Sequence, residues 1–131
     1  MPTPGNKRAL LDTSVLVADD VNLSGLVCQV SALSYAELHF GVQAATSEAV
    51  RLARQHRLTL IQATYGHGLA FSDDTAHHYG LLCARLRQFG RSPRGRALDL
   101  MIAATALSLG VPLVTRNVGD VVRLGVAVLE R

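Results

Sequence analysis

Four acidic side chains lie where an α/β protein collects functional groups. Only ten of the residues are acidic, and these four follow or adjoin expected strand ends and helix starts or lie within an expected helix: Asp12, Glu37, Asp99 and Asp120. Ligands in parallel-sheet folds collect at the carboxyl ends of the strands. Several carboxylates without a His or Cys partner favour Mg²⁺ or Mn²⁺ over zinc. The four residues therefore indicate a metal site whose water could attack a phosphodiester.

Asp12 ends a short apolar run and is followed by two hydroxyl residues, Thr13 and Ser14. One interpretation is a helix N-cap, for which Thr13 and Ser14 are competing candidates. The other is a metal ligand, in which case the two hydroxyls support the carboxylate or a metal-bound water. Asp12 alone does not distinguish them, but the other three acids favour the ligand.

Glu37 lies on an expected helix, in a stripe with Leu33 and Gly41 that Phe40 and Ala44 flank. The spacing places the carboxylate along the apolar side of the helix. A buried carboxylate requires a cation or a hydrogen-bonding partner. The alternative is that Glu37 lies at the edge of the stripe and reaches water.

Asp99 opens the nearly uncharged helix "DLMIAATALSLG", where an acid either caps the first turn or serves as a ligand. Asp120 ends "TRNVGD", after the expected strand that begins "PLVT", and this segment also holds Thr115 and Asn117. Asn, Gly and Asp are common turn formers, so an ordinary turn also explains this segment.

The arginines favour a partner that carries phosphate. Lys7 is the only lysine among thirteen cationic residues, and five of the arginines fall within residues 85–96. The planar guanidinium suits phosphate recognition. Arg85, Arg94 and Arg96 are the candidates for RNA binding, although a solvated helix face explains such a cluster equally simply.

Length and composition predict one α/β domain over residues 1–131, with residues 1–6 frayed. No signal peptide or segment long enough to span a bilayer is apparent, and the two cysteines suit the core of a protein in a reducing compartment. We therefore expect a soluble, cytoplasmic protein.

Hydrophobic spacing predicts strands that alternate with helices along the chain. The expected strands are 8–12, 26–31, 58–62, 112–117 and 125–130. The expected helices are 31–45, 47–58, 71–90 and 98–110, with a helix or turn at 13–20 and a turn between the last two strands. Right-handed crossovers then predict a mostly parallel sheet covered on both faces.

Several motifs, in order, resemble the PIN domain, specifically the VapC toxins of bacterial toxin–antitoxin pairs: "LLDTSVLV", "SYAELHFGV" and "LDLMIAATALSLGVPLVTRNVGD". The resemblance extends from about Arg8 to Leu129. It implies a three-layer α/β/α sandwich, a Mg²⁺-dependent endoribonuclease for which Mn²⁺ can substitute, a homodimer, and inhibition by a small VapB-type antitoxin.

The resemblance also implies roles for individual residues. Metal ligation falls on Asp12 and Asp99, while Glu37 and the last acidic position orient or deprotonate water. That last position is Asp120 or Asn117, because Val121 stands where an aromatic commonly follows the last acid. The expected substrate is structured cellular RNA such as tRNA or rRNA loops, since single-stranded loops are the usual targets of RNA recognition.

Two alternatives remain at this point. A haloacid-dehalogenase-like or receiver-like phosphoryl-transfer domain fits poorly, since Ser14 replaces the second Asp of the former and no late lysine serves the latter. A degenerate PIN-like module that only binds RNA or a protein is the other alternative, and the presence of all four acidic motifs argues against it.

Overall fold

The structure, a computed structural model, describes residues 7–131, with Asp120 described by its backbone alone. The predicted frayed terminus, residues 1–6, lies outside the described residues. The described chain forms ten elements in the order β1 (Lys7–Leu11), α1 (Thr13–Leu16), β2 (Leu26–Val30), α2 (Ala32–Gln43), α3 (Glu48–Tyr65), α4 (Asp73–Gln88), α5 (Ala97–Leu109), β3 (Leu113–Val114), α6 (Val118–Val122) and β4 (Val128–Leu129).

The strands form one parallel sheet with the order β2-β1-β3-β4. Strand β1 is central: it pairs along its whole length with β2, while Leu10 and Leu11 face Leu113 and Val114 of β3. The expectation of a mostly parallel sheet is confirmed. Because all strands run the same way, the segments after β1 and β3 leave the sheet at one edge.

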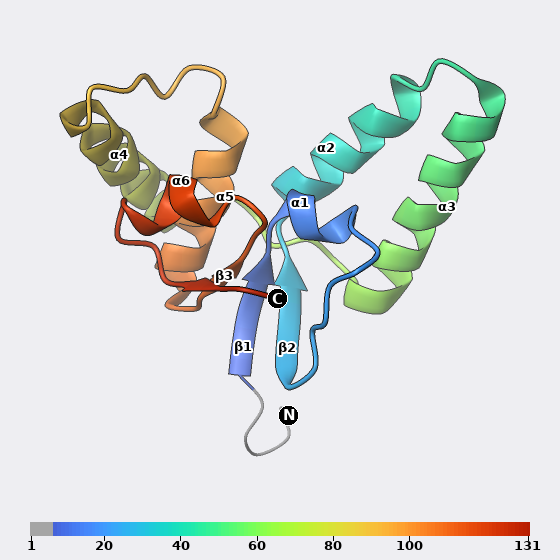
Figure 1. Cartoon of the computed structure of the whole chain (residues 1–131), viewed down its shortest axis with the longest axis horizontal. Coiled ribbons are helices and arrows are strands. Elements are labelled where there is room, and N and C mark those ends of the chain that lie inside the picture. The colour runs from blue at the N-terminus through green and yellow to red at the C-terminus, as the bar shows by residue number, and fades with distance from the viewer. Residues whose placement is uncertain (1–6) are drawn as a thin grey trace.

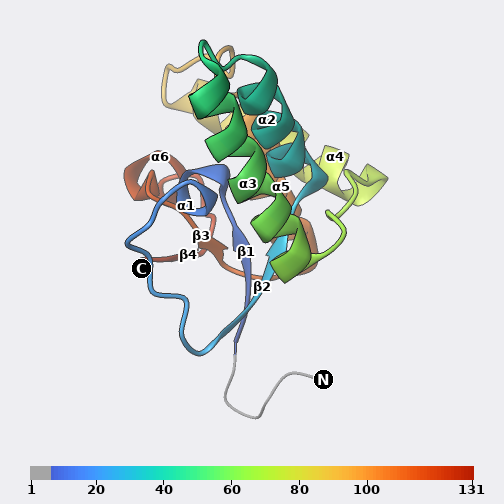
Figure 2. The same ribbon diagram turned by 90° about the vertical axis from the view of Figure 1, so that its right-hand side faces the viewer.

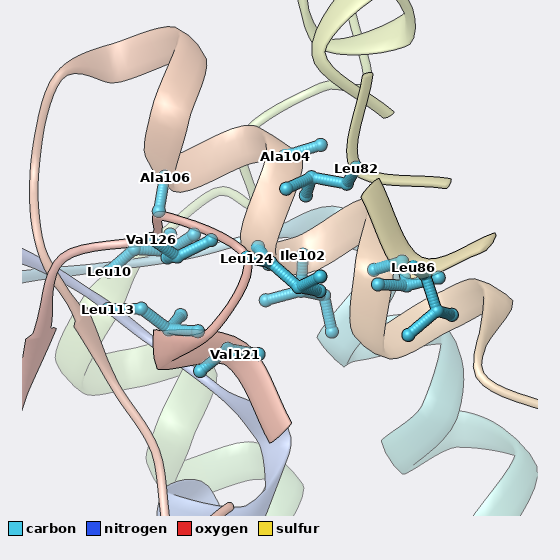
Figure 3. Close-up of a cluster of buried hydrophobic side chains, with 12 residues drawn as sticks. Leu10, Leu82, Leu86, Ile102, Ala104, Ala106, Leu113, Val121, Leu124 and Val126 are labelled. Atoms are coloured by element: carbon cyan, nitrogen blue, oxygen red, sulfur yellow. The ribbon is translucent and has the colours of Figure 1, made fainter. Parts of the chain in front are cut away.

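Helices cover both faces of the sheet, which confirms the predicted α/β/α sandwich (Figures 1 and 2). Successive residues of a strand point to opposite faces. Ala9 and Leu11 accordingly belong to a core cluster with residues of α1, α2 and α3. Leu10 belongs to a second cluster with residues of α4 and α5, including Leu82 and Ile102 (Figure 3). In Figure 1 the α2–α3 pair and the α4–α5 pair diverge above the sheet.

The strand predicted at 58–62 is wrong, because these residues belong to the long helix α3. The physical reason is that no Gly or Pro interrupts residues 48–65, and the apolar spacing continues at helical period through Leu58 and Ile61, which are buried. No helix within residues 7–131 is long and apolar enough to cross a bilayer.

Two further expectations need correction. Phe40, placed in the apolar stripe of α2, is 72% exposed, and the buried residues of that helix are Ser34, Tyr35 and Val42. The segment between the last two strands is not a simple turn but contains α6, while β3 and β4 are each only two residues long.

The connection from α3 to α4 is held against β2 by a close backbone approach. The Leu69 amide donates to the Val30 carbonyl, and the Ala32 amide donates to the Leu69 carbonyl, each at 2.9 Å. A Cβ on Gly68 would lie 2.7 Å from the backbone of Ala32 and 2.9 Å from the Tyr35 ring. Only glycine fits at this position without displacing the start of α2.

We predict that Gly68→Ala destabilises the protein by about 1–3 kcal/mol, because the new methyl group meets backbone atoms that cannot move aside. Denaturant unfolding measures the change. Gly80→Ala is the matched control: Gly80 lies on α4, and a methyl group added there meets no atom within 4 Å, so helix propensity alone predicts an unchanged or increased stability. Equal stability of the two variants would contradict the close approach.

Candidate active site

Asp12 lies at the carboxyl end of β1 and is only 4% exposed. It is the N-cap of α1, so the cap interpretation describes a real contact: Oδ2 accepts from the Ser14 amide at 3.4 Å. The same Oδ2 accepts from Ser14 Oγ at 2.6 Å and from Thr115 Oγ1 at 2.9 Å. Within the described residues, all hydrogen bonds of this carboxylate reach Oδ2, which leaves Oδ1 available to a ligand. Capping and ligation are therefore compatible.

The two hydroxyls that hold Asp12 are themselves fixed by backbone amides of the segment after β3. The Arg116 amide donates to Ser14 Oγ at 3.1 Å, and the Asn117 amide donates to Thr115 Oγ1 at 3.0 Å. The Asp12 amide donates to the Val114 carbonyl at 2.9 Å, which extends the pairing of β1 with β3. The orientation of the carboxylate is thus set by the contact between two strand ends.

Glu37 lies on α2 and is half-buried. Thr13 Oγ1 donates to Glu37 Oε1 at 2.7 Å, and Ser34 Oγ lies 2.9 Å from the same hydroxyl. Burial raises the pKa of the Glu37 carboxyl, the Thr13 hydrogen bond opposes this, and the nearby Asp99 and Asp12 carboxylates raise the pKa further. Glu37 therefore lies within the electrostatic reach of both predicted metal ligands.

Asp99 is exposed and lies in the first turn of α5, where the helix dipole favours a negative charge. It shares with Asp12 a small pocket of about 20 Å³, room for one water molecule or one ion. The polar residues that line this pocket are Asp12, Arg96, Asp99, Thr115 and Asn117. Asp99 and Arg96 also line an adjoining hollow together with Glu37. The fold therefore places Asp12 and Asp99 in one pocket and Glu37 and Asp99 in the hollow beside it.

The chemistry of these donors fits a divalent cation that prefers oxygen ligands, of which Mg²⁺ is one. Among the described side chains, no group of three or more His, Cys, Asp or Glu residues is close enough to hold a metal ion. A Zn²⁺ site built from such a group is therefore not present in this part of the chain. Mg²⁺ is commonly held by one or two carboxylates and keeps several waters, which matches Asp12 and Asp99 in a small polar pocket.

The remaining predicted site residues have different surroundings. Arg96 lines both hollows beside the acids. Arg94 lies in the exposed loop before α5. Arg85 donates to the Leu124 carbonyl, so this guanidinium ties α4 to the chain after α6. The Asp120 side chain lies outside the described residues, and its role stays a prediction.

Sequence reasoning did not single out the basic residues that frame the loop after α1. Arg57 of α3 bonds Asp19 at 2.6 Å and the Leu16 carbonyl at 3.2 Å, while Arg116 pairs with Asp20. These contacts join residues 38 to 96 positions apart, and neither partner carries a local motif. No spacing rule in the sequence could have found them.

The sequence profile of the PIN domain matches residues 9–119. The chain therefore belongs to the PIN domain family. It is 33% identical over 115 residues to ribonuclease VapC5 of Mycobacterium tuberculosis, and the match covers 82% of each chain.

Solved structures share the fold over almost the whole chain. A member of the VapBC family of toxin–antitoxin systems, VapBC-5 from Mycobacterium tuberculosis, superposes with a TM-score of 0.77 at 32% identity, covering 94% of this chain and 96% of that one. FitAcB from Neisseria gonorrhoeae gives a TM-score of 0.76 at 27% identity, covering 92% and 96%. The likeness in sequence and in structure together places the chain among the VapC-type PIN-domain nucleases.

We predict that Glu37→Gln stabilises the protein at neutral pH. The pKa of Glu37 is raised in the folded state. The protonated carboxyl therefore adds to the free energy of unfolding at acid pH, and this contribution is lost as the pH rises through that pKa. The amide avoids this loss and can still accept from Thr13. The gain in melting temperature over wild type should therefore shrink as the pH is lowered toward 4, roughly the pKa of a free carboxyl.

Glu48→Gln is the control with the opposite sign. Its hydrogen bond from Arg51 lowers the pKa of Glu48, so neutralising it should leave stability unchanged or slightly reduced at neutral pH. A Glu37→Gln protein that melts below wild type at neutral pH would show that Glu37 carries a net favourable charge instead.

Proposed function

We propose that the chain is a Mg²⁺-dependent endoribonuclease and the toxin of a VapBC-type pair, acting on structured cellular RNA such as tRNA or rRNA loops. The observation that carries this proposal is the convergence of Asp12, Asp99 and Glu37, from β1, α5 and α2, on adjoining pockets. Support for RNA as substrate comes from the ribonuclease VapC5 of Mycobacterium tuberculosis, at 33% identity.

Each acid has a role that its surroundings suggest. Asp12, with Oδ2 occupied by two hydroxyls, and Asp99, exposed at a helix start, hold the ion. When bound, Mg²⁺ lowers the pKa of water and neutralises charge on phosphate oxygens. Glu37 accepts the proton of the attacking water, and its raised pKa makes its carboxylate a stronger base than an ordinary glutamate. Asn117 lines the pocket and Asp120 is the other candidate for the fourth position.

Arg96 is the cation placed to bind substrate phosphate, since it lines both hollows that contain Asp99. A guanidinium beside a centre of carboxylates also offsets the repulsion that an incoming phosphate meets there. Arg85 and Arg94 remain candidates for contacts farther from the acids, with Arg85 partly engaged in holding Leu124.

A VapB-type antitoxin is the expected partner, and we propose that the protein acts as a homodimer in the cytoplasm. The VapBC-5 structure of Mycobacterium tuberculosis belongs to a family of toxin–antitoxin systems, and this chain matches it at 32% identity over nearly its whole length. The antitoxin would inhibit by covering the acidic pockets.

Asp99→Asn is predicted to lower RNA cleavage by about 100-fold or more, the scale of losing a group that stabilises transition-state charge. Excess EDTA should abolish the wild-type activity, and Mg²⁺ or Mn²⁺ should restore it. The measurement is sequencing of RNA 5′ ends after induction in cells, followed by cleavage of the identified RNA with purified protein.

Asp73→Asn is the matched control, since Asp73 is an exposed acid in the first turn of another helix, α4. It should cleave like wild type. Full activity of Asp99→Asn, or of wild type in EDTA, contradicts the proposal. RNA binding without cleavage by the wild-type protein in Mg²⁺ would instead support the degenerate binding module.

Thr13 is proposed as a positioning residue for Glu37. Removal of its hydroxyl in Thr13→Val deletes the hydrogen bond that lowers the pKa of Glu37, so that pKa rises. Cleavage that depends on ionised Glu37 should then begin at higher pH than in wild type. A pH–rate profile measures this shift, and Thr13→Ser should return the profile to its wild-type position. A Thr13→Val pH–rate profile that stays at the wild-type position would mean that Glu37 is not the proton acceptor.

A further inference from the structure

A groove between α1, α2 and α3 continues the acidic site away from the sheet. Its volume of about 490 Å³ lies within the range of ligand-binding sites. It is lined by Thr13, Val17, Glu37, Leu38, Gly41, Arg54 and Arg57. Glu37 belongs both to this groove and to the hollow that contains Asp99 and Arg96. The groove and the two hollows therefore form a series of neighbouring pockets that share lining residues at the acidic centre.

Arg54 provides an uncompensated positive charge on the far wall of this groove. Its Nη1 donates to the Gly41 carbonyl at 2.6 Å, near the end of α2. Among the described residues, no carboxylate lies within ion-pair distance of Arg54, whereas the neighbouring Arg57 is paired with Asp19. A guanidinium has five N–H donors, so Arg54 keeps several for a ligand.

The groove offers what one nucleotide beyond the acidic centre requires. Gly41 is one helical turn from Glu37, about 6 Å along α2, so Arg54 and Glu37 lie on the same groove about one turn apart. Val17 and Leu38 supply apolar surface, and Val17 is 50% exposed. Apolar side chains can cover a base or ribose while arginine binds phosphate. Arg96 lies on the other side of Glu37, in the neighbouring hollow.

We propose that the substrate strand runs through the series of pockets and that Arg54 binds the phosphate of a nucleotide flanking the cleaved bond. This deepens the proposed function and rests on it. Arg54 thereby extends substrate recognition from α5 to α3. An acidic protein segment is the less favoured occupant, since the Glu37 carboxylate lines the groove and lies near Asp99 and Asp12, which repel further carboxylates.

The experiment compares Arg54→Ala with Arg51→Ala. Both remove one arginine from α3, but Arg51 is engaged by Glu48 through two hydrogen bonds and does not line the groove. Single-turnover kcat/KM is measured with RNA oligonucleotides that carry the mapped cleavage site and are extended by single nucleotides on the 5′ or the 3′ side. The kcat/KM of wild type should rise when the RNA is extended on one side, and Arg54→Ala should lose about tenfold of that rise.

Salt dependence gives a second readout. Loss of one phosphate contact on a single strand should reduce the slope of log kcat/KM against log salt by about 0.7, while Arg54→Lys, which keeps the charge, should retain the slope. Thermal unfolding of each variant checks that loss of the Gly41 contact leaves the fold intact at the assay temperature. Arg51→Ala should match wild type in both readouts.

Three results separate the outcomes. If wild type cleaves no RNA, the proposed function fails and this inference fails with it. If wild type cleaves RNA and Arg54→Ala behaves as Arg51→Ala does, this inference alone is overturned. If Arg54→Ala leaves the RNA data unchanged but weakens binding of an oligo-glutamate peptide, the groove takes an acidic protein segment and the inference is likewise overturned.

Discussion

The structure depends on keeping one buried carboxylate, that of Asp12, in a fixed orientation. Burial of an ionised group without partners is costly, and Asp12 is 4% exposed. Ser14 and Thr115 meet this need through hydroxyls that bond the same oxygen. Thr115 is itself buried and directly follows β3. The pairing of β1 with β3 therefore also fixes the geometry of the acidic pocket. A shift of that pairing by one residue would turn Thr115 away from Asp12.

The surroundings of Glu37 differ from those of Asp12, because the acids near it come from other layers of the fold. Its helix, α2, belongs to the group of helices on one face of the sheet, while Asp99 begins a helix on the other face (Figure 1). The raised pKa of Glu37 reflects first its burial and then the proximity of the Asp99 and Asp12 carboxylates. A cation bound beside these carboxylates would offset the part of the cost that their mutual repulsion causes. Thr13 offsets part of the cost with one short hydrogen bond.

The parallel sheet and its two helical layers could be predicted from the sequence, and so could the acids after β1 and on α2 and α5. The reason is that buried strands and helix starts have local sequence patterns. The face of α2 was not predictable in the same way: Phe40 continues an apolar spacing yet is exposed, and Ser34 is buried because it meets Thr13. The strand expected at 58–62 failed since Leu58 and Ile61 serve equally well as one face of a helix. Arg54 and Arg57 line the groove because of the way α3 packs beside α1 and α2, and no local sequence pattern predicts that packing.

The bond between Asp12 and Thr115 joins residues separated by 103 positions. During synthesis on the ribosome, Asp12 and Ser14 emerge together, whereas Thr115 emerges only after α5 and β3 have been made. Until then, Ser14 is the one of the two hydroxyl partners that the Asp12 carboxylate can reach. A nuclease built in this way completes the hydrogen bonds of its acidic pocket only when β3 pairs with β1.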